Sequence, residues 1–239
     1  MTYNYNKYSY HYKTLLSLGT PLVVGQVGTI VLGFADTLMV GHHSVTELAA
    51  ASFVNTIMAI ILVFALGYSY GLTPIIGRLY GQGNTEKNAA VVKHGLLAAA
   101  TTSVILLAVL YLVYMNIHRM GQPEELLPLM RPYMIVNMIS LPFACWFNTF
   151  KQFFDGIGHT KTSMYIMIAG NILNIGGNYL LIYGPGPMPE LGLLGAGIST
   201  MASRIIMFFA AAAIFLFTKK ALQKGQAGEN HRLATDDGC

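Results

Sequence analysis

Six long apolar runs alternate with short polar segments along the chain. They lie at residues 15–36, 48–77, 95–117, 134–150, 162–183 and 191–218. A helix needs roughly 20 residues to cross a bilayer core of about 30 Å, and each run is close to that length or longer. The pattern therefore predicts an all-α, polytopic membrane protein with six transmembrane helices. Pro132 and Pro142 predict a kink in the fourth helix.

Composition and charge support this interpretation. Hydrophobic residues make up 54% of the 239 positions and charged residues 10%, which is more apolar surface than one soluble core can bury. Of the 14 Lys and Arg residues, only Arg119 and Arg131 lie outside if the N-terminus is cytoplasmic, and Arg204 lies within a run. The positive-inside rule then predicts both termini in the cytoplasm of a multi-pass protein of the cell (inner) membrane. The basic excess reflects orientation among membrane lipids, so we expect no nucleic-acid partner.

The ends of the chain differ from its middle. Residues 1–12 contain five tyrosines, which predict an interfacial N-terminal segment, and residues 13–218 form the six-helix lobe. Residues 219–239 are polar, without apolar periodicity, and are predicted to be a disordered tail.

The sequence contains no motif typical of an enzyme. Cys145 lies inside the fourth run and Cys239 is the last residue, which excludes a disulfide framework and a CxxC metal site. GxGxxG, phosphate-loop and HExxH patterns are absent, and Asp36 is the only carboxylate placed deep in a run, where an aspartyl protease needs two. We expect no enzymatic activity and no organic cofactor.

Asp36 needs a physical reason for its position. An ionisable group near the bilayer centre costs about 2.5 to 3.5 kcal/mol on insertion scales. Asp36 lies about 6 Å below Val40 at 1.5 Å per residue, so one interpretation is that it reaches interfacial water. However, Gly25, Thr29 and Gly33 recur every four residues on the same helix and form a small-residue seam that another helix can approach. Asp36 continues that seam, which predicts that it faces protein.

Polar side chains of the fifth and sixth runs lie at matching depths. Asn171, Asn174 and Asn178 share one helical face. Asn178 lies about 7 Å from the outer edge, Thr200 about 12 Å, and Arg204 one turn deeper. A carboxylate, amides and a hydroxyl can therefore converge in the outer half of the bundle. Such oxygens suit Na⁺, or a proton on the carboxylate; the alternative is interhelical hydrogen bonding alone, about 0.6 kcal/mol per pair.

Further intramembrane polar groups are candidates for the wall of a cavity. They are Gln26, Asn55, Asn171 and Arg204. A single intramembrane amide more often links helices than binds a ligand.

Several stretches together resemble the multidrug and toxin extrusion (MATE) family. They occur in the expected order within residues 13–218: PLVVGQ at 21–26 with ADTLMVG at 35–41, ELAAA at 47–51, GLTPIIGRLYGQGN at 71–84, DGIGHTK at 155–161, NIGGNYLLIYG at 174–184 and LGAGISTMASR at 194–204. The resemblance implies a cation-coupled antiporter that exports cationic, amphiphilic drugs or toxins by alternating access. It also implies that Na⁺ or H⁺ binds in this lobe at Asp36, with Asn174, Asn178 and Thr200 as polar partners.

Two departures from the family pattern leave alternatives open. Many members carry Asp where this chain has Asn178, so one negative charge is missing. Members have about twelve helices in two lobes, whereas this chain resembles the first lobe, so a complete transporter needs a second lobe or a second copy. The alternatives are an inactive truncated fragment, a lipid-linked precursor flippase, for which Arg204 is the only cationic residue placed in the cavity, and a structural or partner-binding subunit.

Overall fold

The computed structural model describes residues 5–185 and 189–236, with side chains for 12–84, 87–185 and 189–219. Every regular element in this part of the chain is helical. The α-helices are α1 (Tyr5–His43), α2 (Val45–Tyr70), α3 (Leu72–Gly81), α4 (Thr85–Asn116), α5 (Leu127–Gly156), α6 (Thr160–Tyr183) and α7 (Gly192–Asp236), and the 3₁₀ turns are η1 (Ile117–Arg119) and η2 (Glu124–Leu126).

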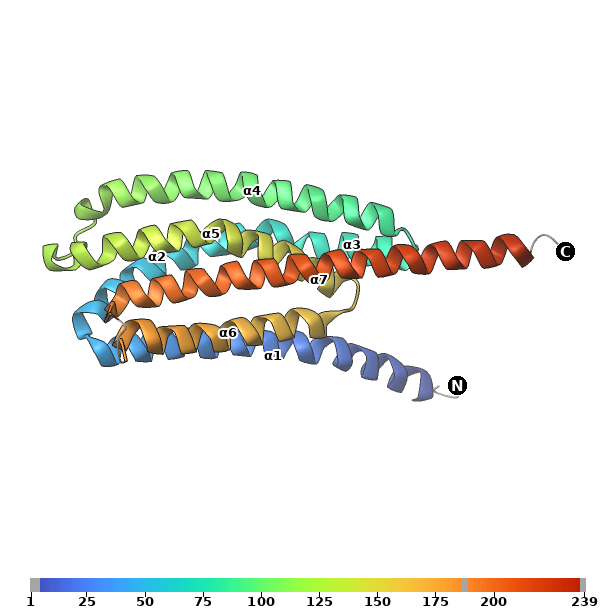
Figure 1. Ribbon diagram of the computed structural model, residues 1–239, viewed down its shortest axis with the longest axis horizontal. Helices are drawn as coiled ribbons and strands as arrows, with labels where there is room; N and C mark the ends of the chain where they lie inside the picture. The colour runs from blue at the N-terminus through green and yellow to red at the C-terminus, as the bar shows by residue number, and fades with distance from the viewer. Residues whose placement is uncertain (1–4, 186–188, 237–239) are drawn as a thin grey trace.

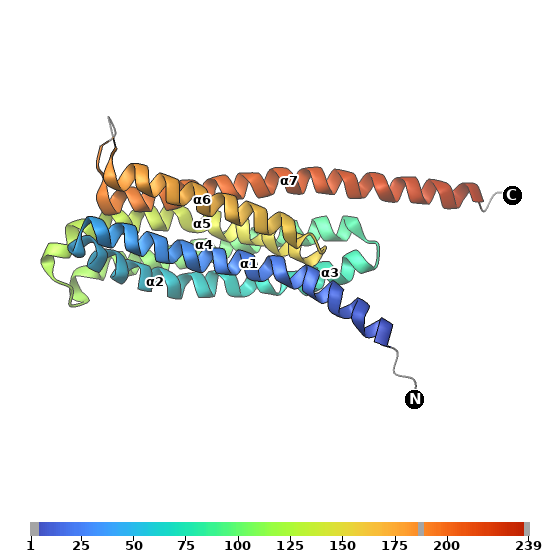
Figure 2. The same cartoon turned by 90° about the horizontal axis from the view of Figure 1, so that it is seen from below.

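Six spans in the described residues are long and apolar enough to cross a membrane, which confirms the prediction. They are Tyr12–His43, Val45–Gly81, Lys87–Arg119, Glu124–Gly156, Thr160–Tyr183 and Gly192–Lys219. An even number of spans places both ends of the bundle on one side, and Figures 1 and 2 show the N- and C-terminal segments there.

Short polar residues or glycine mark where the helices begin and end. Ser44 separates α1 from α2, and its side chain accepts a hydrogen bond from the Glu47 N–H. Asn84 caps α4 through the Lys87 N–H. Gly184 ends α6 in the left-handed conformation that favours glycine. These caps allow tight turns between neighbouring spans.

The second span is interrupted, which its apolar pattern does not predict. α2 ends at Tyr70 and α3 begins at Leu72, with Gly71 between them. Pro74 lies four residues after Tyr70, so it has no N–H to donate to the Tyr70 carbonyl and its ring crowds that oxygen. The span therefore continues as two helices.

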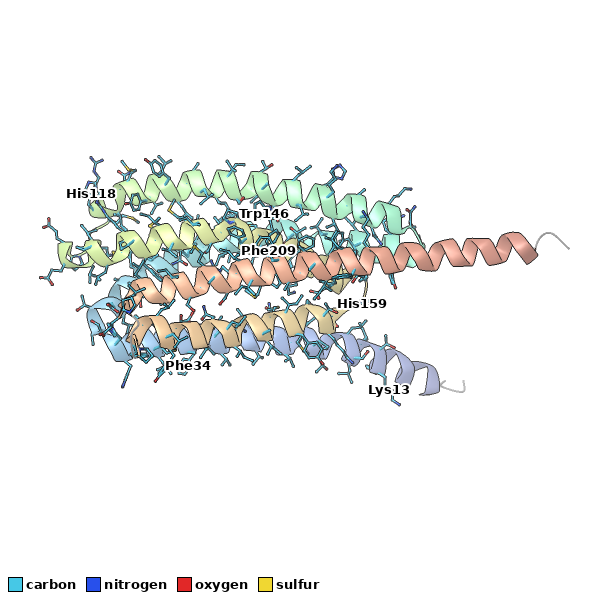
Figure 3. All side chains as sticks on the ribbon, in the orientation of Figure 1. Lys13, Phe34, His118, Trp146, His159 and Phe209 are labelled. Atoms are coloured by element: carbon cyan, nitrogen blue, oxygen red, sulfur yellow. The ribbon has the colours of Figure 1, made fainter. Side chains whose placement is uncertain are left out.

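α7 lies against both α5 and α6, and α1 lies along α6. Figure 3 shows Lys13 and His159 towards the end of the bundle that holds the termini, and His118 at the opposite end. Between α5 and α7, the rings of Trp146 and Phe208 lie 5.5 Å apart, centroid to centroid. α7 therefore joins α6, and the α1 that lies along it, to α5.

Many large apolar side chains point outward. Phe34, at 65% exposure, lies on the outer edge of α1 in Figure 3, and Val63 and Phe217 are more than 70% exposed. Acyl chains or another protein surface must cover such a band of apolar residues. The lobe is therefore built as a multi-pass membrane protein.

In the C-terminal segment α7 continues as a helix to Asp236, and the disordered tail at residues 219–239 stays a prediction. Its last part contains Lys, Ala, Gln, Leu and Glu, which favour helices, and no proline. Figure 1 shows it extending past the other helices. At the N-terminus, α1 begins at Tyr5; the first four residues and the side chains up to residue 11 lie outside the described residues, so the interfacial tyrosines stay a prediction.

Close packing of α6 and α7 predicts the effect of a single methyl group. A Cβ at Gly195 would overlap the main-chain carbonyl of Leu181, whereas a Cβ at Gly176 would meet nothing within 4 Å. We expect Gly195→Ala to destabilise the lobe by about 1 to 3 kcal/mol and Gly176→Ala to be neutral or slightly stabilising. Thermal unfolding of the two variants in detergent checks this. Equal melting temperatures would contradict the close approach.

Candidate functional site

Asp36 and Asn178 join the first span to the fifth. The Asn178 Nδ2 donates a hydrogen bond of 2.5 Å to the Asp36 Oδ1. Asn178 is fully buried and Asp36 is half-buried. The acid therefore faces α6 rather than acyl chains. Of the predicted small-residue seam on α1, Gly25 contacts α6, whereas a Cβ at Gly33 would meet nothing within 4 Å. Close contacts of Gly25 with Met167 and of Gly28 with Asn171 allow α1 and α6 to approach.

The hydrogen bonds continue from Asn178 to α7. The Asn178 Nδ2 also donates to the Asn174 Oδ1 at 3.2 Å, and the Asn174 Nδ2 donates to the Thr200 Oγ1 at 3.1 Å. When the Asn174 amide is rotated by half a turn, its Nδ2 donates to the Asp36 Oδ1 at 2.9 Å and its Oδ1 accepts from the Thr200 hydroxyl. In both orientations, one row of polar groups runs from α1 through α6 to α7.

One buried acceptor in this row has no partner. Within the described part of the chain, the Oδ1 of Asn178 receives no hydrogen bond. A buried acceptor without a donor costs about 1 to 3 kcal/mol. A bound cation or a water molecule would offset that cost.

Two cavities flank Asp36. The larger cavity has a volume of about 470 Å³, and its wall includes Asp36, Asn174, Thr200 and Arg204. The smaller cavity has a volume of about 20 Å³, room for about one water-sized occupant. Its polar wall consists of Asp36, Thr37, Ser52, Asn55, Tyr133 and Thr200. Asp36 therefore stands between a space of the size that small molecules occupy and one of the size of a single ion.

The candidate cavity residues of the sequence divide between these spaces. Gln26, Asn171 and Arg204 line the larger cavity. Asn55 lines the smaller one, where its Oδ1 accepts a 2.9 Å hydrogen bond from the Tyr133 hydroxyl. Asn55 thus lines a different cavity from the other three.

Sequence reasoning missed one charged residue of the larger cavity. Lys151 lines its wall, although its position at the end of a span predicts a cytoplasmic, solvated side chain. It forms a 2.7 Å ion pair with Asp155, one helical turn further along. The sequence signal for this ion pair was the spacing of four residues between Lys151 and Asp155, which places both side chains on one face of a helix.

A second polar layer lies nearer the end of the bundle that holds the termini. Tyr68 shares a 3.1 Å hydrogen bond with Thr149, Ser69 is bonded to Asn148, and Thr73 donates to Gln152. Asn148 also lines the larger cavity. This layer joins α2 and α3 to α5 across the break at Gly71, and it extends the polar wall beyond Arg204.

Comparison with known proteins gives consistent matches. The sequence profile of the MatE family matches residues 21–180. Multidrug resistance protein NorM of Photobacterium profundum is 32% identical over 213 residues, which are 89% of this chain and 47% of that protein. The chain therefore spans about half the length of the curated relative that it matches.

Solved structures show the same fold. A MOP superfamily transporter from Pyrococcus furiosus superposes with a TM-score of 0.78 at 22% identity, over 87% of this chain and 45% of that one. A multidrug resistance MATE family transporter in an outward-facing conformation gives 0.73 at 24% identity, over the same shares of the two chains. The six-helix arrangement corresponds to slightly less than half of each.

Proposed function

This chain belongs to the MatE family of multidrug transporters, and we propose that it forms the lobe that binds the coupling cation of an antiporter. In this proposal Asp36 carries Na⁺ or a proton, and Asn174, Asn178 and Thr200 are its polar partners. The hydrogen bond between Asp36 and Asn178 across α1 and α6 carries the proposal, because the Asn178 amide N–H holds the carboxylate away from lipid and inside the polar row.

The oxygens around Asp36 suit a hard cation. Carboxylate, amide and hydroxyl oxygens are the ligands that Na⁺ and similar ions take in proteins. Asp36 and Thr200 line the smaller cavity, whose volume suits a single ion. Asn178 is bonded to Asp36 outside that wall, and its unpartnered Oδ1 is a further acceptor near the carboxylate. A proton on Asp36 would meet the same amides as hydrogen-bond partners.

Charge compensation at Asp36 links the cation to the exported molecule. An ionised Asp36 attracts a cationic amphiphile in the larger cavity by about 2 kcal/mol at 8 Å with an effective dielectric constant of 20. A Na⁺ ion or proton on Asp36 removes that attraction. Binding of the coupling cation therefore favours release of the drug, which is the exchange that an antiporter performs.

The proposal assigns this chain one lobe of the transport unit. The matched relatives are about twice as long as the matched region. Alternating access requires a second lobe or a second copy of this one, paired about an axis normal to the membrane, as in transporters built from parallel repeats. Crosslinking in membranes distinguishes a paired lobe from a monomer.

Removal of the carboxyl charge tests the cation site without requiring transport. A cation that binds only the folded lobe stabilises it by about 2.7 kcal/mol at one hundred times its dissociation constant. We expect the melting temperature of the chain in lipid nanodiscs to rise with Na⁺ at constant ionic strength or with acid, and Asp36→Asn to abolish that rise. The exposed Glu125→Gln is the matched control. A cation-dependent rise that persists in Asp36→Asn, or is missing from the unaltered chain, would exclude the site.

Restoring the acid that many family members carry at position 178 should increase the affinity for the cation, whereas Asp36→Asn should abolish it. Asn178→Asp would place a second carboxylate in contact with Asp36. Two charges about 3 Å apart repel by roughly 5 kcal/mol at an effective dielectric constant of 20, and a shared cation relieves that repulsion. We expect this variant to bind Na⁺ or H⁺ at least about tenfold more tightly and to be less stable without it. The exposed Asn116→Asp serves as the control, and unchanged cation affinity in Asn178→Asp would contradict the ligand role of residue 178.

A further inference from the structure

Arg204 is held in a fixed position on the wall of the larger cavity. It lies one helical turn from Thr200 on α7, and its Nη1 donates a 2.6 Å hydrogen bond to the Ser140 Oγ on α5. The Ser140 hydroxyl donates in turn to the Asn137 carbonyl at 2.8 Å, and Ser140 is 1% exposed. Because the only proton of that hydroxyl is already used, its oxygen is free to accept from Arg204. The guanidinium is therefore anchored from a neighbouring helix.

The guanidinium charge has no carboxylate partner. None of the ion pairs among the described side chains includes Arg204, and the bond to Ser140 uses one of the five N–H donors of a guanidinium. The other charged groups of the cavity wall are Asp36 and Lys151, and Lys151 is neutralised by Asp155. Asp36 and Arg204 therefore leave one negative and one positive charge facing the same space.

A second donor lies at a similar depth. The Nδ2 of Asn171 is buried without a hydrogen-bond partner in the described part of the chain, and Asn171 lines the same cavity. Asn171 lies one helical turn from Asn174 on α6, just as Arg204 lies one turn from Thr200 on α7, and both steps lead towards the end of the bundle that holds the termini. Asn174 and Thr200 are hydrogen-bonded to each other. The cavity wall therefore includes two residues with unused donors, Arg204 on α7 and Asn171 on α6, and the Nδ2 of Asn171 lies against Gly28 of α1. The remaining wall is largely apolar and includes Phe147, Met167 and Met207.

We propose that Arg204 is the anion-recognising residue of the larger cavity, so that the cavity takes amphiphilic molecules that carry an anionic group beside their cationic one. A molecule with only a positive charge is attracted by Asp36 and repelled by Arg204, and the two effects oppose each other. A zwitterion can place its cationic group towards Asp36 and its carboxylate, sulfonate or phosphate on Arg204. This inference rests on the proposed function, since it takes the larger cavity as the substrate site, and it narrows the class of substrate.

A matched pair of dyes tests the proposal on the chain in lipid nanodiscs. Rhodamine 110 carries a free carboxylate beside its cationic ring system, and its methyl ester lacks that negative charge. Fluorescence polarisation measures the dissociation constant of each dye for the unaltered chain, for Arg204→Gln and for Arg131→Gln, a control that removes an exposed arginine. We expect Arg204→Gln to weaken binding of the acid about tenfold and to leave the ester unchanged or tighter. Arg204→Lys should retain part of the preference for the acid, and Arg131→Gln all of it.

The ratio of the two dissociation constants decides the outcome. An unchanged ratio in Arg204→Gln, or equal weakening of both dyes, would overturn the proposal. If the melting temperature shows that Arg204→Gln does not fold, Ser140→Ala, which leaves the charge and removes its anchor, is scored by the same ratio and should lower the preference for the acid. Asp36→Asn separates this result from the cation site. We expect this variant to lose the cation-dependent rise in melting temperature and to keep the preference for the acid dye, because Arg204 sets that preference.

Discussion

A carboxylate inside a bilayer must find its polar partners in protein, and the hydrogen bond between Asp36 and Asn178 is how this lobe meets that constraint. The bond sets which face of α1 turns inward and requires α6 to lie along it. Asn174 and Thr200 extend the contact to α7, so three helices share one polar row. If the row were broken, the insertion cost of Asp36 would have no compensation.

The long C-terminal helix α7 connects this polar row to the neighbouring helices and cavities. α7 packs on α6 through Gly195 and on α5 through an aromatic layer that includes Trp146 and Phe208. It carries Thr200 to Asp36 and, one turn further, Arg204 to Ser140. The same helix therefore borders both the ion-sized space and the larger cavity. A change in the charge of Asp36 alters the electrostatic potential at Arg204, because these two are the charged groups of the described wall that form no ion pair.

Much of the lobe could be predicted from the sequence, because a bilayer allows few arrangements. The lengths of the apolar runs predict the six spans. The depth of each polar residue along its span, together with helical periodicity, predicts that Asp36 faces Asn178. Features that depend on a single backbone group or on a partner from a distant span were not predicted. The break at Gly71 follows from one missing N–H at Pro74, and the anchor of Arg204 on Ser140 needs the register of α5 against α7.

The central claim is that the Asp36 carboxyl group itself receives the cation. Infrared difference spectroscopy of the chain in lipid, between solutions with and without Na⁺ and between neutral and acid solutions, observes carboxyl vibrations directly. We expect one of the two pairs of solutions to give a carboxyl band change in the unaltered chain that disappears in Asp36→Asn. An identical band change in both proteins, or none in the unaltered chain, would contradict it.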